Sequence, residues 1–163
     1  MVVAKTNDFK LIEAKPFAPN LGAEVYGVDL SKPVPDEQFE EINQAFLKYQ
    51  VLFFKDQSEI PPEQHVAFGK RFGPLHAHPA APTMKGHPEI FEIHATKNSK
   101  VANGEFWHSD VSCDETPPLG TMLQIHIAPP CGGDTMFSDM YAAYEDLSDP
   151  IKNMLGGLSA LHS

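Results

Sequence analysis

The sequence predicts an α+β protein in which short strands form an antiparallel sheet and helices lie at the periphery. Short apolar segments with strand character are mixed with segments of helical period, without regular β–α–β alternation and without a G-x-G-x-x-G turn. The 15 prolines and 11 glycines suit a fold with many turns and short strands. A chain of 163 residues is long enough for one domain with a real core. We therefore expect residues 1–163 to form a single domain.

The first half of the chain predicts strands and two helices. Residues 10–30 alternate apolar and polar positions around two glycines, which is typical of one or two strands with turns. A helix is expected from Asp36, because acidic residues fill its early turns and apolar residues follow at helical spacing. Residues 51–54 predict a buried strand, and a second helix should begin at Pro61 and Pro62 and end at Gly73. The apolar positions of the first helix are Phe39, Ile42, Phe46 and Tyr49.

The second half predicts more loop and shorter elements. Residues 74–88 contain several prolines and histidines and predict a loop, whereas residues 90–94 alternate like a strand. Residues 121–128 predict a further strand, followed by a tight loop at 129–134. Helices are expected over 138–147 and from Asp149 to Gly156, and a last strand should start at Leu158.

Composition excludes several classes of protein. The formal net charge of −10 argues against a nucleic-acid groove, which needs clustered lysine and arginine. Cys113 and Cys131 do not make a disulfide framework, and they lack zinc-site spacing. No apolar run approaches the length of a membrane span. We expect a soluble, cytoplasmic protein without nucleic-acid or membrane partners.

The segment His108-Ser-Asp110 carries the clearest chemistry in the chain. Residues two apart on an extended backbone point to the same side, so an imidazole and a carboxylate can converge there. Such a pair supplies two of the three ligands of a 2-His-1-carboxylate site for non-haem Fe(II). A short H-x-D motif alone is weak evidence, because a hydrogen-bonded His–Asp pair in a loop gives the same pattern.

The motifs around this segment strengthen the metal interpretation. Trp107-His-Ser-Asp110 is followed by Thr116-Pro-Pro118, then by Pro129-Pro-Cys-Gly-Gly-Asp-Thr135 and Ala142-Ala-Tyr-Glu-Asp-Leu147. Upstream, residues 21–30, 50–57 and 68–79 agree in order and spacing. The chain from about Leu11 onward resembles the taurine dioxygenase family of Fe(II)/2-oxoglutarate-dependent dioxygenases. It looks like the N-terminal part of a member.

The resemblance implies a fold, cofactors and site residues. It implies a double-stranded β-helix (jelly roll) with peripheral helices, incomplete at the C-terminus of this chain. His108 and Asp110 would be catalytic metal ligands for Fe(II), and the Thr135 hydroxyl would bind the cosubstrate 2-oxoglutarate. His78 would contact the substrate, a small anionic sulfonate, sulfate ester or carboxylate that is hydroxylated with dioxygen. The family commonly forms dimers or tetramers, so a homo-oligomer is expected.

Two further family positions are expected outside this chain. In the family, the second histidine ligand and the arginine that holds 2-oxoglutarate lie beyond the position of residue 163. Arg71 is the only arginine here, and it lies on a predicted helix upstream of the His-Asp pair. Activity should therefore require residues C-terminal to this segment.

The substrate positions depart from the pattern for taurine. An aromatic family position falls on Ala81, another falls on Cys113, and a polar one falls near Asn103. These differences put taurine itself in doubt and make another sulfonate, a sulfate ester or a carboxylate at least as good a candidate as taurine. His76, which forms a second i, i+2 pair with His78, is interpreted as structural.

Two alternatives remain open from the sequence. A zinc-type metallohydrolase could use the same His108 and Asp110 with an activated water and would ignore 2-oxoglutarate. A truncated, non-catalytic fragment would lack a third metal ligand altogether.

Overall fold

The computed structural model describes residues 9–77, 82–96, 98–99, 104 and 106–162. The chain divides into two compact units, one formed by Met1–Glu59 with Ile125–Ala160 and the other by Ile60–Gln124 with Leu161–Ser163. Helices and small sheets both occur, which confirms the α+β class. The described residues form no closed barrel. The expectation of one domain stays a prediction.

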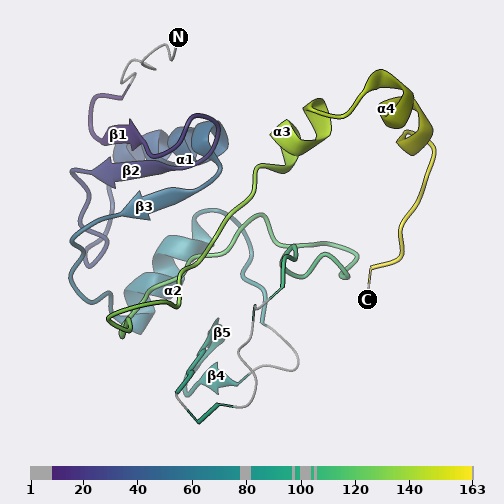
Figure 1. Ribbon diagram of the computed structural model, residues 1–163. Helices are drawn as coiled ribbons and strands as arrows, with labels where there is room; N and C mark the ends of the chain where they lie inside the picture. Colours follow the sequence, from purple (N-terminus) through teal and green to yellow (C-terminus); the bar gives the residue numbers. More distant parts are fainter. Residues whose placement is uncertain (1–8, 78–81, 97, 100–103, 105, 163) are drawn as a thin grey trace. The chain divides into compact units, whose positions relative to one another are not determined.

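A three-stranded sheet organises the first unit (Figure 1). Strands β1 (Glu13–Pro16) and β2 (Ala23–Tyr26) pair antiparallel, whereas β3 (Leu52–Phe54) pairs with β2 in parallel. The predicted strands are therefore present, and the expected antiparallel pairing is confirmed for β1 with β2 but wrong for β2 with β3. Helix α1 connects β2 to β3 and carries the chain back, so that β3 runs in the same direction as β2. The strand predicted as buried at 51–54 is only half-buried.

Helix α1 (Asp36–Tyr49) covers one face of this sheet, as predicted from its periodicity (Figure 1). Asp36 and Glu37 stand in its first turn and Lys48 in its last, an arrangement that complements the helix dipole. Ile42, with 1% of its surface exposed, is buried together with residues of β1, β2 and the connecting loops. The buried apolar residues of this unit are Ile12, Ala14, Ala23, Val25, Val28, Leu30, Val34, Ile42, Ala45 and Tyr49.

Glu41 of α1 holds the backbone of residues 10–12 against this helix. Its two carboxylate oxygens accept backbone N–H bonds from Lys10 (2.9 Å), Leu11 (2.7 Å) and Ile12 (3.1 Å). Burial alone would raise the pKa of Glu41, but these three hydrogen bonds together hold the pKa below its ordinary value. The ionised carboxylate is therefore the form that stabilises the fold.

Replacing Glu41 with glutamine should lower the free energy of unfolding by about 2 kcal/mol at pH 7, since one amide oxygen cannot replace two charged acceptors. Because the pKa of Glu41 is lowered on folding, its contribution is present above the unfolded pKa, 4.5, and is lost as pH falls below it. Urea unfolding at pH 7 and pH 4 measures both effects. A Glu41→Gln deficit that stayed constant across this range would contradict the assignment. Glu40→Gln, at an exposed position beyond the first turn of the same helix, is the matched charge control.

The second unit contains α2 (Pro62–Lys70), β4 (Thr83–Met84) and β5 (His87–Phe91), with α2 packed against β5. The helix was predicted. The loop predicted over residues 74–88 is partly wrong, because β4 and β5 form an antiparallel hairpin there. Gly86, with φ +88°, supplies the left-handed turn residue between the two strands. Strand β5 therefore begins at His87, three residues before the start of the strand predicted over residues 90–94.

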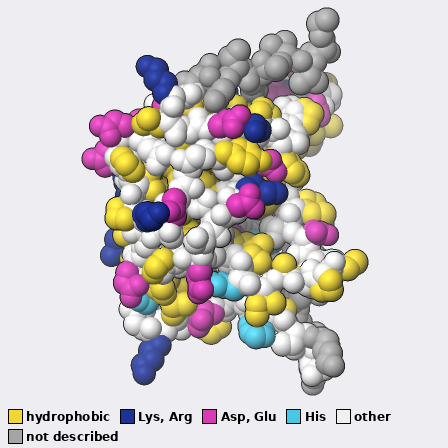
Figure 2. Space-filling view, turned by 90° about the vertical axis from the view of Figure 1, so that its left-hand side faces the viewer, with side chains coloured by type: hydrophobic (Ala, Val, Ile, Leu, Met, Phe, Trp, Pro, Cys, Tyr) yellow, Lys and Arg dark blue, Asp and Glu magenta, His cyan; other side chains and the backbone are white. Residues whose placement is uncertain are grey.

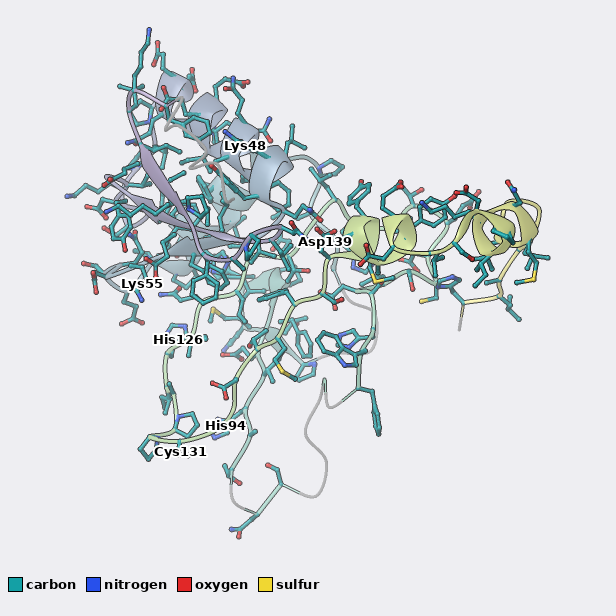
Figure 3. All side chains as sticks on the ribbon, turned by 45° about the horizontal axis from the view of Figure 1, so that its top comes forward. Lys48, Lys55, His94, His126, Cys131 and Asp139 are labelled. Atoms are coloured by element: carbon teal, nitrogen blue, oxygen red, sulfur yellow. The ribbon has the colours of Figure 1, made fainter. Side chains whose placement is uncertain are left out.

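The segment after residue 120 departs most from the expectations. Residues 121–128 and 158–162 are irregular, so both predicted strands are wrong for this structure. A strand needs a neighbour to accept and donate its backbone hydrogen bonds, and the described residues offer none to these segments. The predicted helices are present as α3 (Met140–Glu145) and α4 (Asp149–Leu155). Asp139, at the N-terminal end of α3 (Figure 3), accepts the backbone N–H groups of Tyr141 and Ala142 at 2.9 and 3.0 Å.

The surface carries charged side chains of both signs. On the face drawn in Figure 2, acidic side chains are scattered among the basic ones. In the part of the chain that the structure describes, no helix has the length and apolar character needed to cross a membrane.

Candidate metal site

His108 is held in an orientation that suits a metal ligand. Its Nδ1 lies 2.7 Å from the backbone carbonyl oxygen of Phe106. A carbonyl oxygen can only accept, so Nδ1 carries the proton and donates it. In the neutral ring this leaves the lone pair on Nε2, which is the usual arrangement for a metal-binding histidine whose other nitrogen is hydrogen-bonded.

The surroundings of His108 favour its charged form when no metal competes. The hydrogen bond to the Phe106 carbonyl raises the pKa of His108, burial opposes it, and the neighbouring Asp110 carboxylate raises it further. Two acceptors thus face the two ring nitrogens. A metal cation bound to Nε2 would take the place of the Nε2 proton, and the same Asp110 carboxylate would stabilise its charge.

Asp110 faces the same point as His108. Its Oδ1 lies 3.2 Å from His108 Nε2, and both side chains are more than half exposed. The other oxygen, Oδ2, accepts the hydroxyl hydrogen of Thr121 at 2.8 Å. One carboxylate oxygen therefore faces the imidazole of His108, and the other accepts the hydrogen bond from Thr121.

The separation of the two donor atoms fits a shared metal ion. Two donors that each lie about 2.1 Å from a metal, at right angles to one another, are about 3.0 Å apart. The observed 3.2 Å agrees with this geometry. One imidazole nitrogen and one carboxylate oxygen are also the donor types of a non-haem Fe(II) site. The residues present therefore fit the iron that the sequence predicted, as an incomplete ligand set.

Two further side-chain hydrogen bonds within the second unit hold the turn that follows Asp110. His76 Nε2 lies 2.8 Å from Asp114 Oδ2, and His162 Nδ1 lies 2.9 Å from Ser112 Oγ. His76 thus contacts Asp114 and belongs to the surroundings of the pair. These contacts anchor the segment from Asp110 to Asp114, in which Val111 adopts a left-handed φ of +50°.

The other predicted site residues are not joined to the pair by the described contacts. Thr135 is exposed and belongs to the first unit. It follows Gly132 and Gly133, whose φ angles of +77° and +74° form the predicted glycine turn; a Cβ on Gly133 would come within 3.1 Å of Pro129 Cγ. His78, like Ala81 and Asn103, lies outside the described residues. Cys131, at the bend of that loop (Figure 3), and Cys113 are both free thiols.

A complete set of three ligands does not occur among the described residues. No group of three His, Cys, Asp or Glu side chains is close enough there to hold a metal ion. Sequence reasoning also missed Thr121 and the Phe106 carbonyl as partners of the pair. Thr121 lies eleven residues after Asp110, and no local spacing rule connects them.

Comparison with known proteins identifies the family of this chain. Residues 13–163 match the sequence profile of the taurine catabolism dioxygenase TauD, TfdA family. An alpha-ketoglutarate-dependent sulfate ester dioxygenase from Pseudomonas putida is 32% identical over 152 residues, which cover 93% of this chain and 50% of that protein. The alpha-ketoglutarate-dependent 2,4-dichlorophenoxyacetate dioxygenase of Cupriavidus pinatubonensis is 30% identical, with 93% and 58% covered. The crystal structure of a taurine dioxygenase from Burkholderia xenovorans aligns with a TM-score of 0.71 at 34% identity, covering 91% of this chain and 52% of that one.

The matching sequence profile and the aligned structure define the class of protein as a dioxygenase family. The chain belongs to the TauD, TfdA family. It spans about half the length of the relatives it matches.

Proposed function

We propose that the complete protein is an Fe(II)- and 2-oxoglutarate-dependent dioxygenase that hydroxylates a small anionic organic substrate. The observation that carries the proposal is the His108–Asp110 pair, with Nε2 and Oδ1 3.2 Å apart and their outer atoms hydrogen-bonded. When bound, iron and 2-oxoglutarate would supply the oxidation: one oxygen atom of dioxygen would convert a substrate C–H to C–OH, and the other would enter the succinate formed as 2-oxoglutarate loses carbon dioxide.

The residues of this chain would bind and orient the reacting groups. His108 Nε2 and Asp110 Oδ1 would each donate one lone pair to iron and so take two positions. The remaining ligand, a histidine, and the arginine that binds 2-oxoglutarate would come from the jelly-roll strands beyond residue 163. Thr135 would donate its hydroxyl to 2-oxoglutarate, and His78 would contact the substrate anion.

An anionic substrate is supported by the relatives. The P. putida protein is named for sulfate esters and the C. pinatubonensis protein for a phenoxyacetate, and both compounds are anions. The net charge of −10 means that such a substrate needs locally positive groups. An alkyl sulfate or an aryloxyalkanoate fits these relatives, and taurine stays a candidate beside them.

The first experiment is an anaerobic titration of the purified complete protein with Fe(II) and 2-oxoglutarate. A weak visible charge-transfer band that needs both components is the expected result. Aerobic reactions with an alkyl sulfate, an alkyl sulfonate and a phenoxyacetate should then form succinate in proportion to substrate consumed. Hydroxylation at the carbon that bears a sulfate ester would release sulfate and an aldehyde, which gives an independent product assay.

Two results would overturn the proposal. The first is that the complete protein binds Fe(II) but shows no visible charge-transfer band when 2-oxoglutarate is added. The other is substrate breakdown that proceeds without 2-oxoglutarate and dioxygen, since a hydrolytic metal site would behave in that way.

A further inference from the structure

Thr121 contacts the His108–Asp110 pair through the outer oxygen of Asp110. Its hydroxyl donates to Asp110 Oδ2 at 2.8 Å, while Oδ1 of the same carboxylate lies 3.2 Å from His108 Nε2. The two oxygens of Asp110 are therefore assigned to different partners. Neither Thr121 nor its neighbours lie in a helix or strand, so sheet pairing does not fix this residue.

We infer that Thr121 is a positioning residue that makes Asp110 bind iron through Oδ1 alone, an inference that rests on the function proposed above. A carboxylate can rotate about its Cβ–Cγ bond and offer one or both oxygens to a metal. A hydroxyl that donates to Oδ2 fixes this rotation and occupies the lone pair that a second metal bond would use. Metal-binding carboxylates generally depend on such outer partners.

One-oxygen binding has a consequence for the reaction. A 2-His-1-carboxylate iron site keeps open positions, which 2-oxoglutarate and dioxygen would use. With three protein ligands each taking one position on a six-coordinate metal, three positions remain. A second bond from Asp110 would remove one of them. Thr121 thus protects cosubstrate binding as well as metal affinity.

The symmetry of the two supports strengthens the inference. The Phe106 carbonyl holds the outer nitrogen of His108 at 2.7 Å, and the Thr121 hydroxyl holds the outer oxygen of Asp110 at 2.8 Å. Each ligand then directs a single donor atom to the same point. The backbone support cannot be removed by substitution, but the threonine hydroxyl can.

The test compares Thr121→Val with Thr121→Ser in the complete protein. Valine keeps the shape and removes the hydroxyl, whereas serine keeps the hydroxyl. Binding of Co(II), measured anaerobically by calorimetry as a stand-in for Fe(II), should be about 10-fold weaker in Thr121→Val, as for other outer partners of metal ligands. The 2-oxoglutarate affinity of the metal-loaded protein should fall with it. Thr121→Ser should stay within about twofold of the unmodified protein on both measures.

The control is Thr83→Val, which removes a hydroxyl from an exposed position of strand β4 in the same unit. It should bind metal as the unmodified protein does. Melting temperatures of all variants separate metal binding from folding. If Thr121→Val melts early, Thr121→Ala, which adds no methyl group in place of the hydroxyl, provides the same comparison.

The outcomes separate the two proposals. Equal metal affinity in Thr121→Val and the unmodified protein would overturn the role of Thr121 and leave the proposed function intact. Equal losses in the valine and serine variants would also overturn it, because the hydroxyl would not be the cause. An unmodified protein that binds neither Co(II) nor Fe(II) would overturn both.

Discussion

Replacing Asp110 with asparagine should weaken Fe(II) binding by more than about 100-fold and remove the 2-oxoglutarate-dependent activity of the complete protein. Loss of an outer partner alone costs about 10- to 100-fold in metal affinity, and Asp110 is proposed to bind the metal directly. An amide is close in shape to the carboxylate but carries no charge, so the variant replaces a charged donor oxygen with a weak neutral one and changes the packing little.

The measurement is anaerobic titration of Fe(II) with and without 2-oxoglutarate, followed by succinate formation in air. Glu115→Gln is the matched control, because it removes one negative charge from an exposed position in the same segment. The control should keep its metal affinity and activity. A similar loss in both variants would show that general charge, and not ligation by Asp110, governs binding at this site.

The His108–Asp110 pair illustrates what local sequence can predict. The i, i+2 spacing of His108 and Asp110 predicted that their side chains converge, and their donor atoms do lie 3.2 Å apart. That inference needed only the backbone geometry of three residues. The contact of Asp110 with Thr121 was not predicted, because it depends on how the chain turns over the intervening residues.

In the fold, too, features set by neighbouring residues were predicted, and features set by distant residues were not. Helix α1 was predictable because its apolar spacing and its acidic first turn both lie within 14 residues. The parallel pairing of β2 with β3 was missed, since a strand pattern records which face is apolar but not which neighbour it pairs with. Residues 121–128 carry a strand-like pattern, yet in the described structure no strand pairs with them. Strand formation depends on a partner that local sequence does not specify.

The largest effect on stability should follow from truncating Ile42 to alanine. Ile42 lies on α1 with 1% of its surface exposed and is among the largest fully buried side chains described. Removing its three outer carbons loses their transfer free energy and leaves a cavity, which together cost about 2–5 kcal/mol. Alanine is the better helix former, so the helix itself gains a few tenths of a kcal/mol. The measured loss is therefore a lower limit for the packing contribution.

Leu47 provides the internal comparison, because it lies on the same helix with 67% of its surface exposed. Leu47→Ala removes the same number of carbons but leaves no cavity, so the unfolding free energy should change by less than about 0.5 kcal/mol. Urea unfolding followed by circular dichroism measures both variants under one set of conditions. Equal losses would mean that α1 does not bury Ile42 against the sheet, and the packing of the first unit would have to be revised. A large loss for Ile42→Ala alone would show that the buried side of α1 contributes to the core that contains Ala14 of β1 and Val25 of β2, because these side chains are buried in the same unit.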